Sequence, residues 1–520
     1  MATCSKAPDD SRRGEDELAL LERVRAAAEF LESIEADRWL LDSLPAEDRE
    51  RLHKAVAQFY DPDPVARRRR VKAAERGRTA MAAERADSVL NETGIRVLRR
   101  APVFTTANVY PPDGFEQRDV DAEESERRET DELQHCYICK QKFSDIHHFY
   151  DQMCPPCAAF NFAKRTEYAD LSGRVALLTG GRVKIGYQAG LKLLRAGAHL
   201  IVTTRFPRDS AARYAKEPDL AEWGHRLEIF GLDLRHTPSV EAFCREIIAT
   251  HTRLDFIINN ACQTVRRPPE FYQHMMDGER AALTDAPERV RRLLGKYEGM
   301  RGEPGGALTV GGGLSEAMGL TRAAELSQLA LLPEEFPGEK HLFPDGVLDQ
   351  DLQQVDLRGR NSWRLLMAEI STVELLEVQL INAVAPFVIN ARLKPLMMRT
   401  PERDKHIVNV SAVEGQFYRN RKTIRHPHTN MAKAALNMMT RTAATDYYND
   451  GIHMNSVDTG WVTDEDPVEI AARKTAEQRF HPPLDIVDGA ARIVDPIMTG
   501  IKTGEHVWGQ FLKDYRPADW

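Results

Sequence analysis

The segment RVALLTGGRVKIGYQAGLKLLRAGAHLIVTTR (174–205) decides the fold. Its apolar run 174–180 predicts a buried strand, the stretch 187–198 has helical periodicity, and the apolar run 199–205 predicts a second strand. Glycines between the first strand and the helix allow a tight turn and a close approach to phosphate, and the helix N-terminus adds N–H groups and positive charge. This order therefore predicts a βαβ unit with a dinucleotide-binding loop.

The remaining chain continues the alternation of strands and helices. Apolar runs predict strands over 226–234, 254–261, 406–412, 452–458 and 507–515, and helical patterns cover 239–251, 372–398 and 429–448. This spacing predicts an α/β fold with a doubly wound parallel sheet of the Rossmann type. Residues 263–360 interrupt the rhythm with helical pieces (287–297, 320–332) and a glycine-rich break (305–314), and they predict a partly folded insertion.

Four motifs in this order resemble the short-chain dehydrogenase/reductase superfamily: TGGRVKIG (179–186), LDL (232–234), NNA (259–261) and AKAAL (432–436). The resemblance covers about 170–262 and 361–520 and implies an oxidoreductase that acts on a carbonyl/alcohol pair. It also implies that Asn259 holds the strand behind the coenzyme. The coenzyme-binding residues that it implies are Thr179, Gly180, Gly181, Arg182, Lys184, Ile185, Gly186, Asp233, Leu234, Asn260, Ala261, Lys433, Gly460 and Thr463.

Two positions bear on the choice of coenzyme. The second strand ends in Arg205, where an acidic residue would bind the ribose 2′-OH of NAD, while an arginine accommodates the 2′-phosphate of NADP. We therefore predict that NADP(H) is preferred over NAD(H); the alternative is that Arg205 only faces solvent. Lys184 stands where the family has the middle glycine of its loop, and its side chain either hinders the pyrophosphate or contacts it through its charge.

The resemblance implies four catalytic roles, of which this chain keeps two. Lys433 matches the lysine that lowers the pKa of the family's tyrosine, and Asn382 matches the asparagine of the proton relay. Thr429 replaces the tyrosine, four residues before the lysine on one helix face, and Ala412 replaces the serine. Ser411 is one place early, so we expect its side chain to face away from the substrate.

Another proton donor could replace the missing tyrosine. The segment 416–428 carries Tyr418, His426 and His428, and Tyr418 is the candidate that we add to the catalytic set of Lys433, Asn382 and Thr429. The alternative is that these side chains are solvated. The leading hypothesis is an atypical NADP(H)-binding oxidoreductase with a non-standard proton donor. The alternative is a catalytically silent NAD(P)-binding sensor or scaffold that engages a partner through its N-terminal modules.

The start of the insertion lies near the predicted substrate entrance, because ligands bind beyond the carboxyl ends of the strands. It carries two arginines and several aromatic side chains. A lid for an anionic or aromatic ligand, an oligomer contact and a plain loop are all compatible with this composition. The residues concerned are Arg266, Arg267, Phe271, Tyr272 and His274.

Cys136, Cys139, Cys154 and Cys157 form two Cys-x-x-Cys pairs 14 residues apart. Two such pairs complete a tetrahedron of thiolates, so the spacing predicts a structural zinc ion with no position left for a substrate. The alternative is four unliganded thiols. We expect a small aromatic core around the ion, made of Tyr137, Phe143, Phe149 and Tyr150, and docking against the nearby first strand of the dehydrogenase domain.

The chain has 520 residues, with 71 basic and 79 acidic side chains and a net charge of −8, which argues against a nucleic-acid binder. Seven cysteines, no apolar run of about 18 residues and no secretory signal predict a cytoplasmic protein without a membrane span. The four arginines Arg67–Arg70 are the sole hint of a nuclear location. The expected partners are a small carbonyl or alcohol substrate, a second copy of the chain, and a protein bound by the N-terminal modules.

These observations divide the chain into six parts. The N-terminal region has helical periodicity, and a charged stretch without it follows. The predicted parts are a helical region (1–110), a charged linker (111–133), the Cys4 zinc module (134–165), the Rossmann domain in two segments (166–262 and 361–520) and the insertion (263–360).

Overall fold

The computed structural model describes residues 10–37, 39–60, 64–100, 129–302, 318–332, 340–344, 347, 354–418, 422–478 and 481–520. The chain divides into two compact units between Glu84 and Arg85. The first unit is helical, as its periodicity predicts, and none of its described side chains is buried. Its helices are α1 (Asp10–Ala36), α2 (Trp39–Asp42), α3 (Ala46–Tyr60) and the first part of α4 (Pro64–Asn91).

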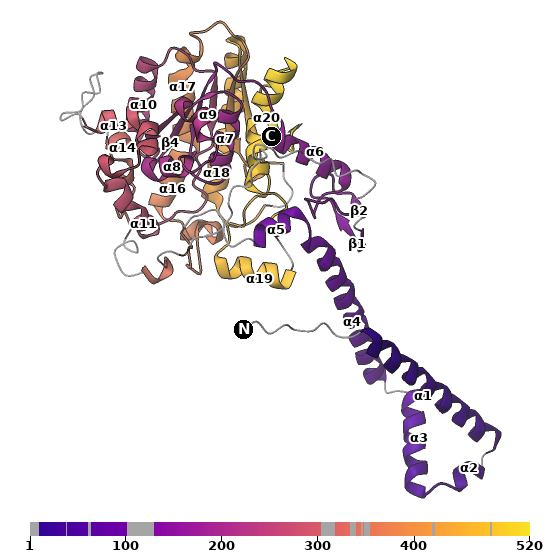
Figure 1. The fold of residues 1–520 in the computed structure, drawn as a ribbon. Coiled ribbons are helices and arrows are strands. Elements are labelled where there is room, and N and C mark those ends of the chain that lie inside the picture. Colours follow the sequence, from indigo (N-terminus) through magenta and orange to yellow (C-terminus); the bar gives the residue numbers. More distant parts are fainter. Residues whose placement is uncertain are drawn as a thin grey trace. The chain divides into compact units, whose positions relative to one another are not determined.

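The second unit is built on an eight-stranded sheet in the order β10-β9-β8-β7-β6-β3-β4-β5. Figure 1 shows helices packed around this sheet. All neighbouring strands are parallel except β9 and β10. The seven predicted strands, β3 to β9, are all present within a few residues of their expected bounds, and the edge strand β10 was not predicted. The strands of the sheet are β3 (Val175–Thr179), β4 (His199–Thr204), β5 (Leu227–Gly231), β6 (Phe256–Asn259), β7 (Lys405–Ser411), β8 (Ile452–Asp458), β9 (Phe511–Lys513) and β10 (Arg516–Ala518).

Helices cover both faces of this sheet. The strand order reverses between β3 and β6, so right-handed crossovers place the helices that follow β3 and β4 opposite those that follow β6 and β7; the helix that precedes β9 packs with the first set. Helices α7 (Lys184–Arg195), α8 (Pro207–Tyr214) and α20 (Ile486–Thr503) belong to one layer. Helices α10 (Thr237–Thr250), α16 (Thr372–Gln379), α17 (Ala385–Met397) and α18 (Pro427–Asn449) belong to the other.

Shorter elements complete the unit. The helices are α5 (Gly94–Arg100), α6 (Pro155–Thr166), α9 (Leu220–Trp223), α11 (Pro269–Arg280), α12 (Glu288–Leu293), α13 (Gly295–Gly302), α14 (Met318–Thr321), α15 (Ala323–Leu326) and α19 (Val468–Gln478). Single 3-10 turns cover Gly224–Arg226, Leu283–Asp285, Lys340–Leu342, Ser362–Arg364, Met367–Glu369 and Val413–Gly415. Helices α11 to α15 lie in the insertion, which is therefore partly folded. Its glycine-rich break (305–314) lies outside the described residues.

The helix predicted over 372–398 is present and is more apolar than expected. Residues Thr372–Met397 form α16, a π-helical turn (Leu380–Val384) and α17, and an 18-residue window within them, with a mean hydropathy of 1.5, is long and apolar enough to cross a membrane by length and composition. The expectation that no such run exists was therefore wrong. The buried side chains of α17 include Ile389, Leu393 and Leu396, and the helix packs against β6, β7 and α10. It is apolar because it forms a layer of the sheet's core.

A small module precedes the sheet. Strands β1 (Glu129–His135) and β2 (Lys142–Asp145) pair antiparallel, and α6 follows them. The predicted linker 111–133 lies largely outside the described residues, and its last five residues belong to β1. Leu90 and Ile95, which we expected in the helical N-terminal region, pack in the core of this module, so the second unit starts earlier than predicted.

Candidate active site

A cavity of about 370 Å³ opens beyond the carboxyl ends of β3 to β6, at the point where the strand order reverses. This is the position where open α/β sheets bind ligands. Thr179, Gly181, Lys433 and Gly460 are predicted coenzyme residues that do not line it. Those that do are Gly180, Arg182, Lys184, Ile185, Gly186, Arg205, Asp233, Leu234, Asn260, Ala261 and Thr463.

The glycine-rich turn at the floor of this cavity has no room for side chains at two positions. A Cβ on Gly186 would lie 2.2 Å from the carbonyl oxygen of Gly180 and 2.4 Å from Nδ2 of Asn260. Asn260 Nδ2 donates to the carbonyls of Thr179 and Gly180, both at 3.1 Å, and so fixes the turn. Lys184 has φ +54°, the left-handed backbone that the family's glycine adopts without strain.

Three arginines and a tyrosine line or border the end of the cavity near β4. Arg205 Nη2 donates to the Tyr272 hydroxyl at 2.8 Å, and its guanidinium lies 4.6 Å from the centre of that ring. Burial alone would raise the pKa of Tyr272, but Arg205, Arg182 and Arg267 together lower it below its usual value. Arg182 also pairs with Asp209 at 2.8 Å. Arg267 likewise pairs with Asp356, so two of the three arginines around Tyr272 have a carboxylate partner.

Tyr272 comes from α11, so the insertion contributes directly to this cavity. Phe271 and Arg267 line it as well, while Arg266 is buried against Glu377 at 2.7 Å and His274 is exposed. The sequence predicts that these residues lie near the substrate entrance, but it does not assign them to the predicted coenzyme site. The sequence signal for their position in the cavity is the cluster RRPPEFY (266–272), which closely follows the NNA strand at the carboxyl edge of the sheet.

Asp233 is held by the cation that follows it. Its carboxylate accepts from Arg235 at 2.7 Å, and Arg235 also donates to Glu377 at 2.9 Å. Burial would raise the pKa of Asp233, but the Arg235 guanidinium lowers it. Asp233 thus stays ionised at the cavity wall.

Asn259 lies behind the sheet's switch point and is held through its amide nitrogen, while its Oδ1 has no hydrogen-bond partner among the described residues. Its Nδ2 donates to Oδ1 of Asn390 at 2.9 Å and to Oδ1 of Asn409 at 2.8 Å. The three amides tie β6 to α17 and β7. This bond network supplies the physical basis for the strand-holding role expected of Asn259.

Asn382 and Lys433 are both buried and oriented by backbone groups. Asn382 lies in the π-helical turn; its Oδ1 accepts from the backbone N–H of Gln263 at 2.8 Å and its Nδ2 donates to the same residue's carbonyl at 3.1 Å. Lys433 Nζ donates to the carbonyl of Val410 at 2.8 Å. π-Helical turns often occur at functional sites because they re-aim a side chain, and here the turn brings Asn382 to the end of β6.

The two replaced catalytic positions differ in their surroundings. Thr429 is buried in α18, and its hydroxyl has no hydrogen-bond partner among the described residues. Ser411 is also buried, and its hydroxyl donates to Oδ1 of Asn437 in α18 at 2.6 Å. Ala412 follows directly after β7. The hydroxyl of Ser411 is therefore committed to the helix.

Of the candidate donors, none lines the cavity. Tyr418 is 54% exposed, and its hydroxyl lies 3.5 Å from Nε2 of Gln416. His426 stacks on Trp363 with ring centroids 3.8 Å apart. His428 is buried, with Nε2 3.2 Å from Glu374 Oε1 and no described partner for Nδ1.

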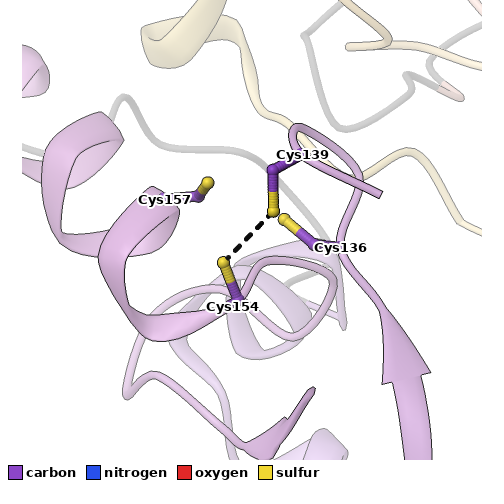
Figure 2. A group of neighbouring side chains, drawn as sticks. All are labelled: Cys136, Cys139, Cys154 and Cys157. Atoms are coloured by element: carbon purple, nitrogen blue, oxygen red, sulfur yellow. Dashed lines mark hydrogen bonds between the residues drawn. The ribbon is translucent and has the colours of Figure 1, made fainter. Parts of the chain in front are cut away.

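The four cysteines converge on one point (Figure 2). All their sulfurs lie within 4.8 Å of one another, and the Cys139 and Cys154 sulfurs are 3.6 Å apart. Ligands 2.3 Å from a tetrahedral zinc ion are about 3.8 Å from each other, which this pair nearly matches. Burial and the neighbouring Cys154 thiol raise the pKa of Cys157, whereas at Cys136 burial is outweighed by hydrogen bonds from backbone groups of the cluster, which lower its pKa to about 7.

Local structure explains how these cysteines are presented. Cys136 ends the β1 side of the hairpin, Cys139 lies in its turn, Cys154 is the N-cap of α6, and Cys157 is in its first turn. Pro155 at the first helical position suits the start of α6. The expected aromatic side chains all pack in the module's core: Tyr137, Phe143, Phe149 and Tyr150.

The cysteine module docks on the segment that follows β8, not on the first strand as expected. The Tyr137 hydroxyl accepts from the N–H of Trp461 at 3.0 Å, and Arg99 Nη2 donates to the carbonyl of Leu484 at 2.6 Å. Val462 and Leu484 share one apolar core with the cysteines, and Ile185 of the glycine-rich loop packs against it. The module therefore supports the segment that carries Gly460 and Thr463.

Two family profiles match this chain. The profile described as short chain dehydrogenase covers residues 174–278, and the one described as enoyl-(acyl carrier protein) reductase covers 362–483. Together they fall on the two halves of the sheet and leave out most of the insertion. The chain belongs to the short-chain dehydrogenase/reductase superfamily.

Several relatives of this superfamily member are known by sequence. An uncharacterized protein of Acanthamoeba polyphaga mimivirus is 30% identical over 389 residues, which cover 73% of this chain and 74% of the viral protein. Dehydrogenase/reductase SDR family member 13 of Bos taurus is 36% identical over 22% of this chain and 29% of its own length. A fatty acyl-CoA reductase of Acinetobacter baylyi is 30% identical over 24% of this chain, which spans 42% of that enzyme.

Solved structures match this chain at low identity and low TM-score. A short-chain dehydrogenase/reductase from Burkholderia multivorans with bound NADP is 17% identical, with a TM-score of 0.39, over 67% of this chain and 99% of that one. The Pseudomonas aeruginosa RhlG/NADP complex is 16% identical, with a TM-score of 0.40, over 66% of this chain and 96% of that one.

Proposed function

We propose that this superfamily member is an NADP(H)-dependent oxidoreductase that interconverts a carbonyl and an alcohol with a non-standard proton donor. The observation that carries the proposal is the end of the cavity near β4, where Arg182, Arg205 and Arg267 surround Tyr272. An NAD site would need an acidic side chain at the end of β4 to bind the ribose hydroxyls. Arg205 occupies that end of the strand.

The residues of the cavity fit this coenzyme. A Cβ on Gly180 or Gly186 would collide with Ala261 or with the Gly180 carbonyl, so these glycines permit the tight turn, and the N-terminus of α7 adds partial positive charge for a pyrophosphate. Asp233 and Leu234 would flank the adenine, and Thr463 would bond the nicotinamide amide. When bound, the nicotinamide ring would supply or accept the hydride.

The chain's own residues would do the remaining work. Lys433 would bind the nicotinamide ribose, and Asn382 would orient the relay through its bonds to Gln263. Thr429 is too weak an acid for proton transfer near neutral pH. Tyr418, His426 and His428 therefore remain the proposed donors, and Tyr418 would need a rearrangement of the loop around it to reach the cavity.

Fluorescence titration with NADPH and NADH tests the choice of coenzyme. We expect tighter binding of NADPH, and Arg205→Leu should weaken NADPH binding by about 10- to 100-fold, because a hydrogen bond to a charged group contributes about 1.5–3 kcal/mol. NADH serves as the matched control ligand, since its affinity should hardly change. Tighter binding of NADH to the wild type would contradict the proposal.

A panel of carbonyl substrates with NADPH tests the chemistry. Lys433→Ala should abolish turnover, and Tyr418→Phe should reduce it if the phenol is the donor. Full activity of Tyr418→Phe would assign the proton to another group, for which His428→Gln is the next variant.

A second candidate function is that of a silent NADP(H)-binding sensor or scaffold. Thr429 and Ala412 favour it, because each replaces a reactive hydroxyl of the family. The helical unit also exposes large apolar side chains, with Trp39 79% and Phe59 88% exposed, which a partner protein could cover. Tight NADPH binding without turnover of any carbonyl or alcohol in the panel would favour this role.

We also propose that the four cysteines hold a structural zinc ion in a reducing, cytoplasmic environment. Four thiolates leave no open position on the ion, so it would stabilise the module and take no part in the reaction. Metal analysis of the purified chain tests this proposal. A matched Cys139→Ser variant should lose one zinc ion per chain relative to the wild type.

A further inference from the structure

Three histidines meet at the edge of the sheet opposite the cavity. His406 and His453 are directly paired in the parallel ladder of β7 and β8, near the amino ends of both strands. His506 follows the C-terminus of α20, and its ring packs against both of the others, with centroid distances of 5.1 Å to His406 and 4.7 Å to His453. His406 and His453 are buried, while His506 is partly exposed.

The ring nitrogens of these histidines converge. One nitrogen of each lies within 4.8 Å of the others, and Nε2 of His406 is 3.0 Å from Nδ1 of His506. Two imidazole nitrogens bound 2.0–2.1 Å from a tetrahedral zinc ion lie about 3.3 Å apart, so this pair needs little movement to share an ion.

A backbone carbonyl orients the third ring. Nδ1 of His453 lies 3.1 Å from the carbonyl oxygen of Lys405, the arrangement of an N–H donor that leaves Nε2 with a lone pair. A metal-bound histidine generally has such an acceptor for its other nitrogen, because it fixes the tautomer and the ring orientation.

Gly500 keeps space open beside the convergent nitrogens. It lies inside α20, where glycine is about 1 kcal/mol less favourable than alanine and no unusual backbone angle requires it. A Cβ at this position would lie 2.5 Å from Nδ1 of His506 and 2.9 Å from Nε2 of His406. A methyl group would therefore press against the two atoms that face each other.

We propose that His406, His453 and His506 form a metal site for a zinc-class divalent ion, separate from the cysteine site and from the coenzyme cavity. Imidazole ligands suit zinc, copper and nickel, and the fourth position would be open to water on the side of the partly exposed His506. The ion would join β7, β8 and the end of α20, and would thus stabilise the sheet edge next to β9.

A second cluster of similar composition is not proposed as a metal site. His199, Glu228 and His251 also lie within 4.8 Å of one another, but the Lys296 ammonium is 2.7 Å from Glu228 Oε1. That cation already neutralises the carboxylate and would repel an ion. His251 therefore provides a matched control for the histidine site.

Zinc analysis of the full chain after depletion and equilibration with zinc tests the proposal. His506→Ala should lower the zinc content by one ion per chain and weaken binding at this site by about 100-fold or more. Gly500→Ala should have the same effect through occlusion, and it favours the helix, so it covers the case in which His506→Ala does not fold. His251→Ala should leave the zinc content unchanged.

The cysteine site is distinguished by its own variant. Cys139→Ser should remove a different ion, and Cu²⁺ added to that variant should show nitrogen hyperfine coupling in its EPR spectrum. The measured quantity is the difference in zinc content between the wild type and each variant. A loss of zinc from the histidine site would therefore be detected even if the cysteine site bound no zinc. An unchanged zinc content in both His506→Ala and Gly500→Ala would overturn the proposal.

Discussion

Arg165 is the polar anchor between the cysteine module and the dehydrogenase domain, and Arg165→Met should weaken the second unit severely. Its guanidinium is buried and donates to Asp485 at 2.8 and 3.0 Å and to Asp488 at 2.9 Å. It also lies 4.4 Å from the centre of the Phe149 ring. Both carboxylates are buried, so removal of the cation leaves two acidic groups without their main partner.

The magnitude follows from this burial. Removal of one partner of a buried ion pair typically destabilises a protein by about 3–5 kcal/mol. We expect the lower end, about 3 kcal/mol, because two compensations remain. Asp488 contacts the Tyr150 hydroxyl, and burial together with the Asp485 charge raises its pKa, so it can take up a proton. Asp485 keeps its bonds to the backbone N–H groups at the start of α20.

Urea unfolding of the full chain, followed by circular dichroism, measures the loss, and hydrogen exchange of α6 and α20 locates it. Arg392→Met is the matched control, since Arg392 is 58% exposed in its pair with Glu241 and should contribute less than about 1 kcal/mol. Exchange should accelerate in α6 and in the first turns of α20 in the Arg165 variant alone. If the free energy of unfolding decreases by the same small amount in both variants, Arg165 is not a buried anchor.

Four further outcomes follow from the site. Gly186→Ala should abolish NADPH binding while the circular dichroism stays unchanged, because its Cβ would lie 2.2 Å from the Gly180 carbonyl oxygen; wild-type affinity in a titration would contradict this. Thr429→Tyr combined with Ala412→Ser should raise carbonyl reduction by about 100-fold, since it restores a phenol one helical turn before Lys433; unchanged rates would show that the donor lies elsewhere. Burial raises the pKa of Asp458 to about 6 from 3.8, so the folded protein favours the protonated carboxyl. The free energy of unfolding therefore falls as the pH rises through 6 and this carboxyl ionises. Asp458→Asn should therefore gain up to about 3 kcal/mol relative to the wild type between pH 4 and pH 7 in urea unfolding, and a constant difference would contradict the raised pKa. Chelation of zinc should weaken NADPH binding in titrations, because the cysteine module supports the segment with Gly460 and Thr463; equal affinities before and after chelation would separate the module from the coenzyme site.

Much of the fold follows from local patterns. The apolar runs that become β3 to β8 are short and bounded by glycine or polar residues, and such periodicity depends only on neighbours in the chain. The predicted strands over 226–234 and 507–515 are longer than β5 and β9, because polar and loop residues extend the apolar pattern there. The linker prediction differed at β1, because its charged residues pair with β2 through the backbone, which composition does not reveal.

The candidate site was only partly accessible to this reasoning. The roles of Lys433 and Asn382 were predicted from the resemblance to the superfamily, and the glycine-rich turn from its place between a strand and a helix, and both depend on local motifs. Tyr272 was placed near the entrance, but its bond to Arg205 joins residues 67 positions apart. The docking of the cysteine module also depends on contacts such as Arg99 with Leu484, 385 positions apart. Periodicity carries no information about such distant partners.

The sequence by itself determined the mostly parallel α/β sheet, the glycine-rich turn between β3 and α7 and the spacing of the four cysteines. Each of these depends on residue type and on spacing along a few turns of chain. Only the tertiary structure decided that the insertion supplies Tyr272 to the cavity, that the cysteine module supports the segment after β8, and that His406, His453 and His506 meet. These features arise where strands and helices distant in sequence pack together, because side-chain packing in three dimensions selects the partners.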